Sequence, residues 1–167
     1  VQESSATACV NAQTASTTVT VNPLPTASIT RSTDAVCVNG TAPTVTLTGI
    51  GGTAPYTFVY TVNGGVNQTI TSTVNTATIT VPVTAAGTFT YQLVSVQESS
   101  ATACVNAQTA STTVTVNPLP TASITRSTDA VCVNGTAPTV TLTGIGGTAP
   151  YTFVYTVNGG VNQTITS

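Results

Sequence analysis

Apolar and polar residues alternate along most of the chain with a period of two, which is the spacing of a β-strand with one buried face. The polar partners are mostly Thr, and β-branched side chains suit a pleated, half-buried surface. The alternating apolar positions are Ala27, Ile29, Val45, Leu47, Tyr56, Phe58, Tyr60, Val62, Ala77, Ile79, Val81, Phe89, Tyr91, Leu93, Val114 and Val116. Each predicted strand therefore has an apolar face and a Thr face, as a sandwich of two sheets requires.

Turn signals separate these runs. Asn63-Gly64-Gly65 lies between two strand-like runs and predicts a hairpin. Gly51 and Gly52 precede the aromatic run and predict a loop or a bulged corner. About seven short strands in roughly 100 residues are typical of an immunoglobulin-like sandwich. The expected fold class is therefore all-β, with tandem immunoglobulin-like β-sandwich domains.

The chain contains a perfect internal repeat. Residues 1–72 recur as residues 96–167 without a mismatch, which sets the period at 95 residues. Solenoid repeats are about 20 to 50 residues long, whereas about 100 residues make a whole β-sandwich domain. We therefore interpret the repeat as an array of near-identical domains, with a duplication introduced by cloning as the alternative.

Two proline-rich segments mark the expected domain boundaries. Proline fixes its own φ angle and lacks the amide hydrogen that a strand needs, so Val-Asn-Pro-Leu-Pro is expected to end a strand and to stiffen a linker. The linker prolines are Pro23, Pro25, Pro118 and Pro120. The predicted domains are the C-terminal end of a preceding repeat at 1–25, a complete repeat at 26–120 and the N-terminal part of a following repeat at 121–167. On this interpretation the chain belongs to a longer polymer.

The composition narrows the range of functions. The chain has two cationic side chains, both Arg, four acidic side chains, no His and a net charge of −2. No nucleic-acid partner is expected, because two cationic side chains cannot neutralise a row of phosphates. Without imidazole bases or ligands, neither an enzyme nor a metal or cofactor site is expected.

A few side chains suggest chemistry at first sight. Asp34 and Glu98 would need a sugar cleft between them to act as a glycosidase pair, and solvated loop positions are the favoured interpretation. Tyr56, Phe58 and Tyr60 could form a carbohydrate platform, but their common parity predicts a place in the core.

The four cysteines indicate disulfides and an oxidising compartment. A bond between Cys37 and Cys104 would close each repeat on itself, and Cys9 and Cys132 would then pair with residues outside this chain. The alternative, Cys9 with Cys37 and Cys104 with Cys132, would staple adjacent repeats across the linker. The bond within one repeat is favoured, because closing a loop of that length stabilises a domain by about 4 kcal/mol.

Three segments and one cysteine carry a resemblance to a known family: Gly-Gly-Thr-Ala-Pro-Tyr-Thr-Phe-Val-Tyr at 51–60, Ala-Gly-Thr-Phe-Thr-Tyr-Gln-Leu-Val-Ser-Val at 86–96, the later Cys104 and Thr-Val-Thr-Val-Asn-Pro-Leu-Pro at 113–120. The resemblance is to the tandem repeats of giant cell-surface gliding adhesins of Bacteroidota, of the SprB type. It implies export by type IX secretion, an extracellular location attached to the outer membrane, and adhesion during gliding motility. The implied partners are neighbouring repeats and, through regions outside this chain, the secretion and gliding machinery.

Two functions from different classes follow. The first is a structural spacer, in which rigid sandwiches form the stalk of a long extracellular adhesin filament. The second is a multivalent module whose loops bind a glycan or an abiotic surface, with avidity compensating for weak single sites. A filament of non-covalently assembled chains is disfavoured, because no counterpart of residues 73–95 is available to complete the terminal fragments.

Overall fold

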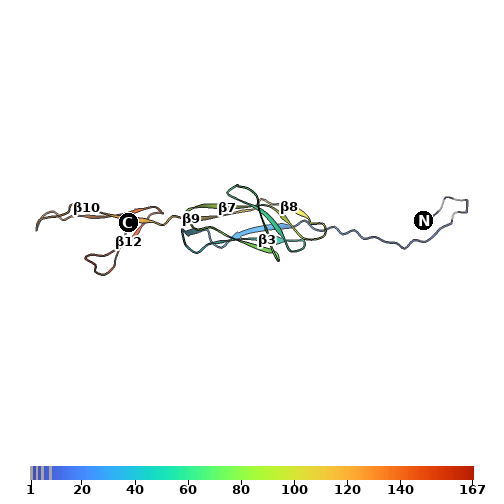
Figure 1. The fold of residues 1–167 in the computed structure, drawn as a ribbon, viewed down its shortest axis with the longest axis horizontal. Helices are drawn as coiled ribbons and strands as arrows, with labels where there is room; N and C mark the ends of the chain where they lie inside the picture. Colours follow the sequence, from blue (N-terminus) through green and yellow to red (C-terminus); the bar gives the residue numbers. More distant parts are fainter. Residues whose placement is uncertain (1, 3, 5, 8) are drawn as a thin grey trace.

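The described chain is elongated and consists of β-strands joined by turns and loops (Figure 1). The computed structural model describes residues 1–167 except residues 1, 3, 5 and 8, and none of the described residues lies in a helix. The strands are β1 (Thr26–Arg31), β2 (Ala35–Cys37), β3 (Thr44–Ile50), β4 (Thr57–Val62), β5 (Gln68–Thr71), β6 (Thr76–Thr80), β7 (Gly87–Gln97), β8 (Val105–Ala107), β9 (Ser111–Asn117), β10 (Thr121–Arg126), β11 (Val140–Ile145), β12 (Thr152–Tyr155) and β13 (Gln163–Thr166). The predicted all-β class is confirmed.

The strands β1 to β9 form two sheets. In the smaller sheet, β3 lies between β1 and β6 and pairs with both in antiparallel register. The larger sheet has the order β2-β9-β7-β4-β5, and β8 pairs with the C-terminal part of β7. Only β2 and β9, among the pairs described in this sheet, run parallel. The long strand β7 therefore has β9 beside its first half and β8 beside its last residues, at opposite ends of the sheet (Figure 1).

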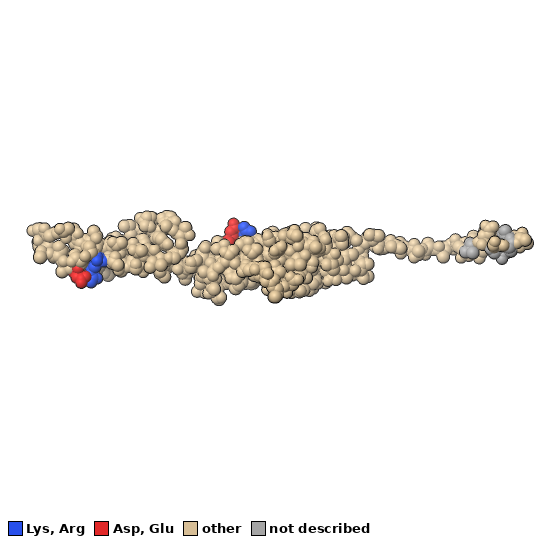
Figure 2. Space-filling model, turned by 90° about the horizontal axis from the view of Figure 1, so that it is seen from above, with Lys and Arg blue, Asp and Glu red and all other residues tan. Residues whose placement is uncertain are grey.

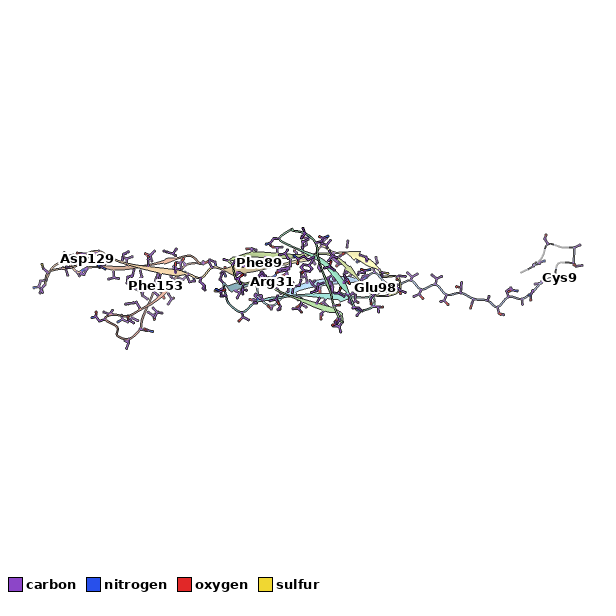
Figure 3. The ribbon with its side chains drawn as sticks, in the orientation of Figure 1. Cys9, Arg31, Phe89, Glu98, Asp129 and Phe153 are labelled. Atoms are coloured by element: carbon purple, nitrogen blue, oxygen red, sulfur yellow. The ribbon has the colours of Figure 1, made fainter. Side chains whose placement is uncertain are left out.

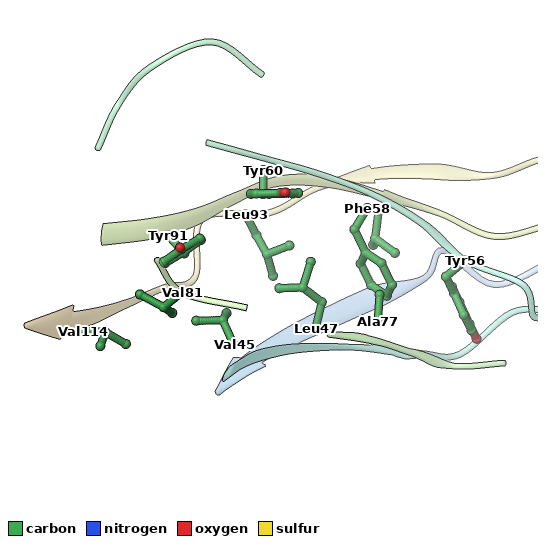
Figure 4. Close-up of a cluster of buried hydrophobic side chains, with 11 residues drawn as sticks. Val45, Leu47, Tyr56, Phe58, Tyr60, Ala77, Val81, Tyr91, Leu93 and Val114 are labelled. Atoms are coloured by element: carbon green, nitrogen blue, oxygen red, sulfur yellow. The ribbon is translucent and has the colours of Figure 1, made fainter. Parts of the chain in front are cut away.

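The core lies between these two sheets (Figure 4). The smaller sheet contributes Val45 and Leu47, and the larger sheet contributes Phe58 and Leu93, all with no exposed surface. The full cluster is Val45, Leu47, Tyr56, Phe58, Tyr60, Ala77, Val81, Tyr91, Leu93, Val96 and Val114. The prediction that Tyr56, Phe58 and Tyr60 belong to the core rather than to a sugar platform is thus confirmed.

A glycine in β3 makes room for the first aromatic ring of the core. A Cβ atom on Gly49 would lie 2.5 Å from Cγ of Tyr56, closer than side-chain atoms pack. Tyr56 Oη donates a hydrogen bond of 2.6 Å to the carbonyl oxygen of Gly51. Gly51 and Gly52 have φ angles of 71° and 80°, in the left-handed region that favours glycine. The expected corner at Gly51 and Gly52 therefore also holds the ring and the hydroxyl of Tyr56 in place.

A register shift in the larger sheet changes which residues of β7 face the core. The pairing of β4 with β7 shifts by one residue between Val59 and Tyr60. As a result Leu93 and Val96 are both fully buried, although simple alternation would place them on opposite faces. Parity alone therefore does not predict the place of Val96.

Identical sequences adopt different structures in different parts of the chain. Residues 111–117 form β9 against β7, whereas residues 16–22 have the same sequence and form no strand. Likewise β2 pairs with β9, but its copy at 130–132 forms no strand. The pairs β10–β11 and β12–β13 keep the registers of β1–β3 and β4–β5. A segment of the repeat is thus folded where its pairing partners lie in the chain, while the predicted boundaries after Pro25 and Pro120 stay a prediction.

Candidate functional site at the linker

The first linker contacts the end of the sandwich that carries β8. Asn22 Nδ2 donates hydrogen bonds to Oγ1 of Thr102 at 2.7 Å and to Oγ of Ser100 at 3.2 Å. Asn106 Nδ2 donates to the carbonyl oxygen of Pro25 at 2.8 Å, and Pro25 itself is buried. These contacts tie the linker to the β7–β8 loop and to β8, on one side of the molecule where the N-terminal segment arrives (Figure 1).

Glu98 organises the loop that receives the linker. Its carboxylate accepts hydrogen bonds from Ser100 Oγ at 2.5 Å, Ser100 N at 2.7 Å, Cys104 N at 2.8 Å and Thr53 N at 3.2 Å. The residue is only 2% exposed and lies close to the point where the linker joins (Figure 3). Gly52 is required beside it, since a Cβ there would lie 2.8 Å from Cγ of Glu98. The carboxylate therefore holds the β7–β8 loop against the glycine corner.

Hydrogen bonding controls the ionisation of Glu98. The bond from the Ser100 hydroxyl, followed by those from the amides of Cys104, Ser100 and Thr53, outweighs burial and lowers the pKa of Glu98 to about 2 from its usual 4.5. A depressed carboxyl pKa contributes stability above pH 4.5, and that contribution is lost as the pH falls from about 4.5 to about 2.

Acid titration of a Glu98→Gln variant tests this role. We expect the variant to unfold more easily than the wild type at neutral pH, because the amide offers one acceptor fewer to the donors of the loop. We also expect the free energy of unfolding of the variant to decrease less than that of the wild type between about pH 4.5 and 2. Urea unfolding at a series of pH values measures both effects. Asp34→Asn, at an exposed position, is the matched control and should keep that part of the acid dependence.

The burial of Glu98 differs from the interpretation made from the sequence. A solvated loop position was expected for both Asp34 and Glu98, and it holds for Asp34, whose side chain is 82% exposed. The structure does not bring the two carboxylates together: Asp34 precedes β2, and its carbonyl oxygen accepts from Thr115 N of β9, whereas Glu98 follows β7. The available signal was a lone acid in a run of small donors, Glu-Ser-Ser-Ala-Thr-Ala-Cys.

The predicted disulfide between Cys37 and Cys104 is wrong for this structure. All four cysteines lie among the described residues, and all four are free thiols. Cys37 is the register partner of Asn117 beside the start of β7, whereas Cys104 precedes β8 beside the end of β7. The ten residue steps along β7 separate the two cysteines by about 33 Å. A disulfide needs Cα atoms within about 7 Å.

The alternative pairing is not formed either. Cys9 lies in the N-terminal segment, beyond the end of the sandwich that carries Glu98 (Figure 3), whereas Cys37 ends β2 beside the last residue of β9. Cys132 lies beyond β10, whereas Cys104 lies at the end of β7. The pairing of Cys9 and Cys132 with residues outside this chain stays a prediction.

A cavity of about 440 Å³ lies at the second linker. It is lined by Cys37 and Asn117 from one side, by Pro118 and Pro120 of the linker, and by residues after β11 such as Gly147 and Tyr151. Pro120 is exposed, whereas its copy Pro25 is buried at the first linker. The two linkers therefore share a sequence and differ in what covers them.

Charged side chains are few and paired on the visible surface (Figure 2). Arg31 Nε lies 2.5 Å from Oδ1 of Asp34, and the copies Arg126 and Asp129 are 2.6 Å apart. Arg31 also donates from Nη1 to Oγ1 of Thr112 at 2.8 Å, which links the two sheets. Exposed pairs of this kind contribute under about 1 kcal/mol to stability.

In the described part of the chain, no three side chains of Cys, Asp or Glu gather closely enough to hold a metal ion. Nor do the described residues include a helix with the length and apolar character needed to cross a bilayer. No protein-family model, curated protein or solved structure matches this chain.

Proposed function

We propose that the chain is a repeat segment of a long extracellular adhesin filament and acts as its stalk. The observation that carries the proposal is the linker of the repeat, which is hydrogen-bonded to the next sandwich rather than free. Asn22 and Pro25 engage the β7–β8 loop and β8 through side-chain and backbone groups. A linker held in this way supports a fixed direction between successive domains.

The perfect repeat supports a tandem arrangement. With a 95-residue period and identical linkers at 21–25 and 116–120, every junction of an array has the same sequence and can make the same contacts once the following repeat is complete. The folded copies at β10–β11 and β12–β13 keep the register of the complete sandwich. We propose that each repeat is an immunoglobulin-like sandwich. On this proposal, residues 121–167 begin a repeat that about 48 further residues of the polymer complete.

The cellular setting is proposed from the resemblance to gliding adhesins. On that basis the filament is exported by type IX secretion, attached at the outer membrane and used in adhesion and gliding motility. The low charge and the Thr-rich strands suit a solvated, polar surface with few charged side chains. Neighbouring repeats are the proposed partners of each domain, and a glycan or an abiotic surface is the target of the whole filament.

A variant with a loosened linker tests the stalk function. The chain is extended by a further copy of residues 73–120, so that two complete repeats flank the linker at 116–120. In the variant, Pro118→Gly relaxes a fixed φ angle and Asn117→Ala removes the proposed counterpart of the Asn22 contacts, while Pro120 is kept because its copy Pro25 is buried in the sandwich. We expect the variant to be shorter on average in small-angle scattering, with unchanged urea unfolding.

The control for this comparison is Asn67→Ala, at an exposed asparagine in the β4–β5 turn. It should leave the scattering profile as in the wild type. If the wild type proves as flexible as the glycine variant, the stalk function is excluded and a flexible multivalent binder becomes the better account.

A further inference from the structure

Cys37 lies at the end of the sandwich from which the second linker leaves. It ends β2 and is the register partner of Asn117, the last residue of β9. Val38 N donates to the carbonyl oxygen of Asn117 at 2.9 Å, which continues this pairing. Neighbouring strands are about 5 Å apart, so the exposed Cys37 lies directly beside Asn117 at the start of the second linker.

Cys104 lies at the opposite end of the sandwich, where the first linker arrives. Its Sγ atom is 3.4 Å from Oγ1 of Thr102, and the same Oγ1 accepts the 2.7 Å hydrogen bond from Asn22. Cys104 is partly exposed at this position. The thiol is therefore one side chain away from the linker asparagine.

Asn22 and Asn117 are the same position of the repeat. When a following repeat docks on the second linker as residues 26–117 dock on the first, Asn117 contacts the copy of Thr102. The copy of Cys104 is then next to that threonine, and Cys37 is next to that asparagine. The two thiols flank one hydrogen bond from its two sides.

The cavity at the second linker has room for this arrangement. Cys37 lines it together with Gly147 and Thr148, which are the copies of Gly52 and Thr53. In the complete sandwich those two residues hold the loop that begins with Glu98 and ends at Cys104. The occupant that fits the cavity is therefore the β7–β8 loop of the following repeat.

We propose that Cys37 of each repeat forms a disulfide with the copy of Cys104 in the following repeat. The inference rests on the tandem arrangement proposed above, and it differs from both pairings considered from the sequence. In every repeat, Cys37 bonds to the following repeat and Cys104 bonds to the preceding one, so each junction has one disulfide. The cross-link bridges the Pro-Leu-Pro segment and restrains bending at the linker, in the direction along which a filament is pulled.

The reaction is a thiol–disulfide exchange. The two thiols lose two protons and two electrons and form one S–S bond, while a disulfide oxidant, either a protein or glutathione disulfide, accepts them and is cleaved to two thiols. Both cysteines of the described sandwich have exposed surface, so the oxidant has access before the bond closes. An oxidising extracellular compartment supplies such oxidants.

Disulfide mapping in the extended chain tests the proposal. The chain with an added copy of residues 73–120 is oxidised with glutathione disulfide, alkylated, denatured and digested with trypsin. Trypsin has one site in each repeat, after Arg31 and after Arg126, and so separates residues 32–126 from the C-terminal fragment. We expect non-reducing mass spectrometry to find these two fragments joined by one disulfide.

Matched cysteine variants identify the bond. Cys37→Ser should abolish the joined species, whereas Cys104→Ser and Cys132→Ser should retain it. The chain of residues 1–167 without the added copy should give no joined species, although it retains both Cys104 and Cys132. A joined species that survives Cys37→Ser, or that disappears in Cys104→Ser or Cys132→Ser, would overturn the proposed pairing.

Folding of the added repeat is measured separately, by the resistance of Arg126 to trypsin before denaturation. Resistance at Arg126 without the joined fragments would overturn the disulfide and leave the tandem stalk intact. If Arg126 stays as sensitive as in the chain of residues 1–167, the tandem arrangement fails, and the disulfide fails with it.

Discussion

Phe58→Ala should lower the free energy of unfolding of the sandwich by about 3–5 kcal/mol. Phe58 is fully buried between Ile70 of β5 and Val96 of β7, and its ring stacks on Tyr56 at a centroid distance of 6.2 Å. Truncation removes this buried surface and leaves a cavity that a two-sheet core closes only in part. Urea unfolding followed by circular dichroism measures the loss.

The chain contains its own control for this substitution. Phe153 is the copy of Phe58, pairs with Ile165 and lies 6.2 Å from the ring of Tyr151, but it is only partly buried. In residues 1–167 it has no counterpart of β7 to pack against. Phe153→Ala should therefore leave the main unfolding transition unchanged. Equal losses for the two variants would contradict the assignment of the core to residues 26–117.

Trypsin should cleave the folded chain after Arg126 at least about tenfold faster than after Arg31. The two sites have the same flanking sequence, so the protease itself has no preference between them. Arg31 bridges to Thr112 of the opposite sheet and is 35% exposed, whereas Arg126 is 65% exposed and its sheet consists of β10 and β11 alone. A two-stranded pair opens far more often than a packed sandwich.

The products identify the site that is cut first. Cleavage at Arg126 yields residues 1–126 as a stable intermediate, whereas cleavage at Arg31 yields residues 1–31. Denatured chain should be cut at both sites at equal rates, which controls for local sequence. Early appearance of residues 1–31 from the folded chain would show that 121–167 is packed as firmly as 26–72.

Local patterns predicted the strands and most of the core. The alternation around Leu47 and Phe58 reports which face of a strand is apolar, and that is a property of neighbouring residues along the chain. The hairpin at Asn63 and the corner at Gly51 are likewise short-range features. Val96 is the exception, because the register shift against β4 depends on a strand more than 30 residues away.

Long-range contacts explain what the sequence did not predict. Glu98 is buried because donors from Thr53, Ser100 and Cys104 converge on it, and one of them comes from the glycine corner 45 residues earlier. The cysteine pairing was wrong because β7 separates Cys37 from Cys104 along its whole length. Spacing along the chain carries no information about which end of a sheet a cysteine reaches.

The contacts of Asn22 connect the partly exposed linker at 21–25 to the loop that Glu98 organises. The carboxylate fixes the β7–β8 loop, and the loop presents Ser100 and Thr102 to the asparagine of the linker. The order of the loop and the direction of the linker are therefore coupled. Weakening Glu98 should loosen the junction as well as the domain.

Electron microscopy of arrays with increasing numbers of repeats shows whether successive repeats add as rigid units along one axis. β7 has 11 residues and spans about 33 Å at 3.3 Å per residue step, and the loops and linker bring the axial step to roughly 40 Å. We predict that the contour length and the mean end-to-end distance both grow linearly, by that step for each added repeat. An end-to-end distance that grows as the square root of the repeat number, as in a flexible chain, would contradict the account.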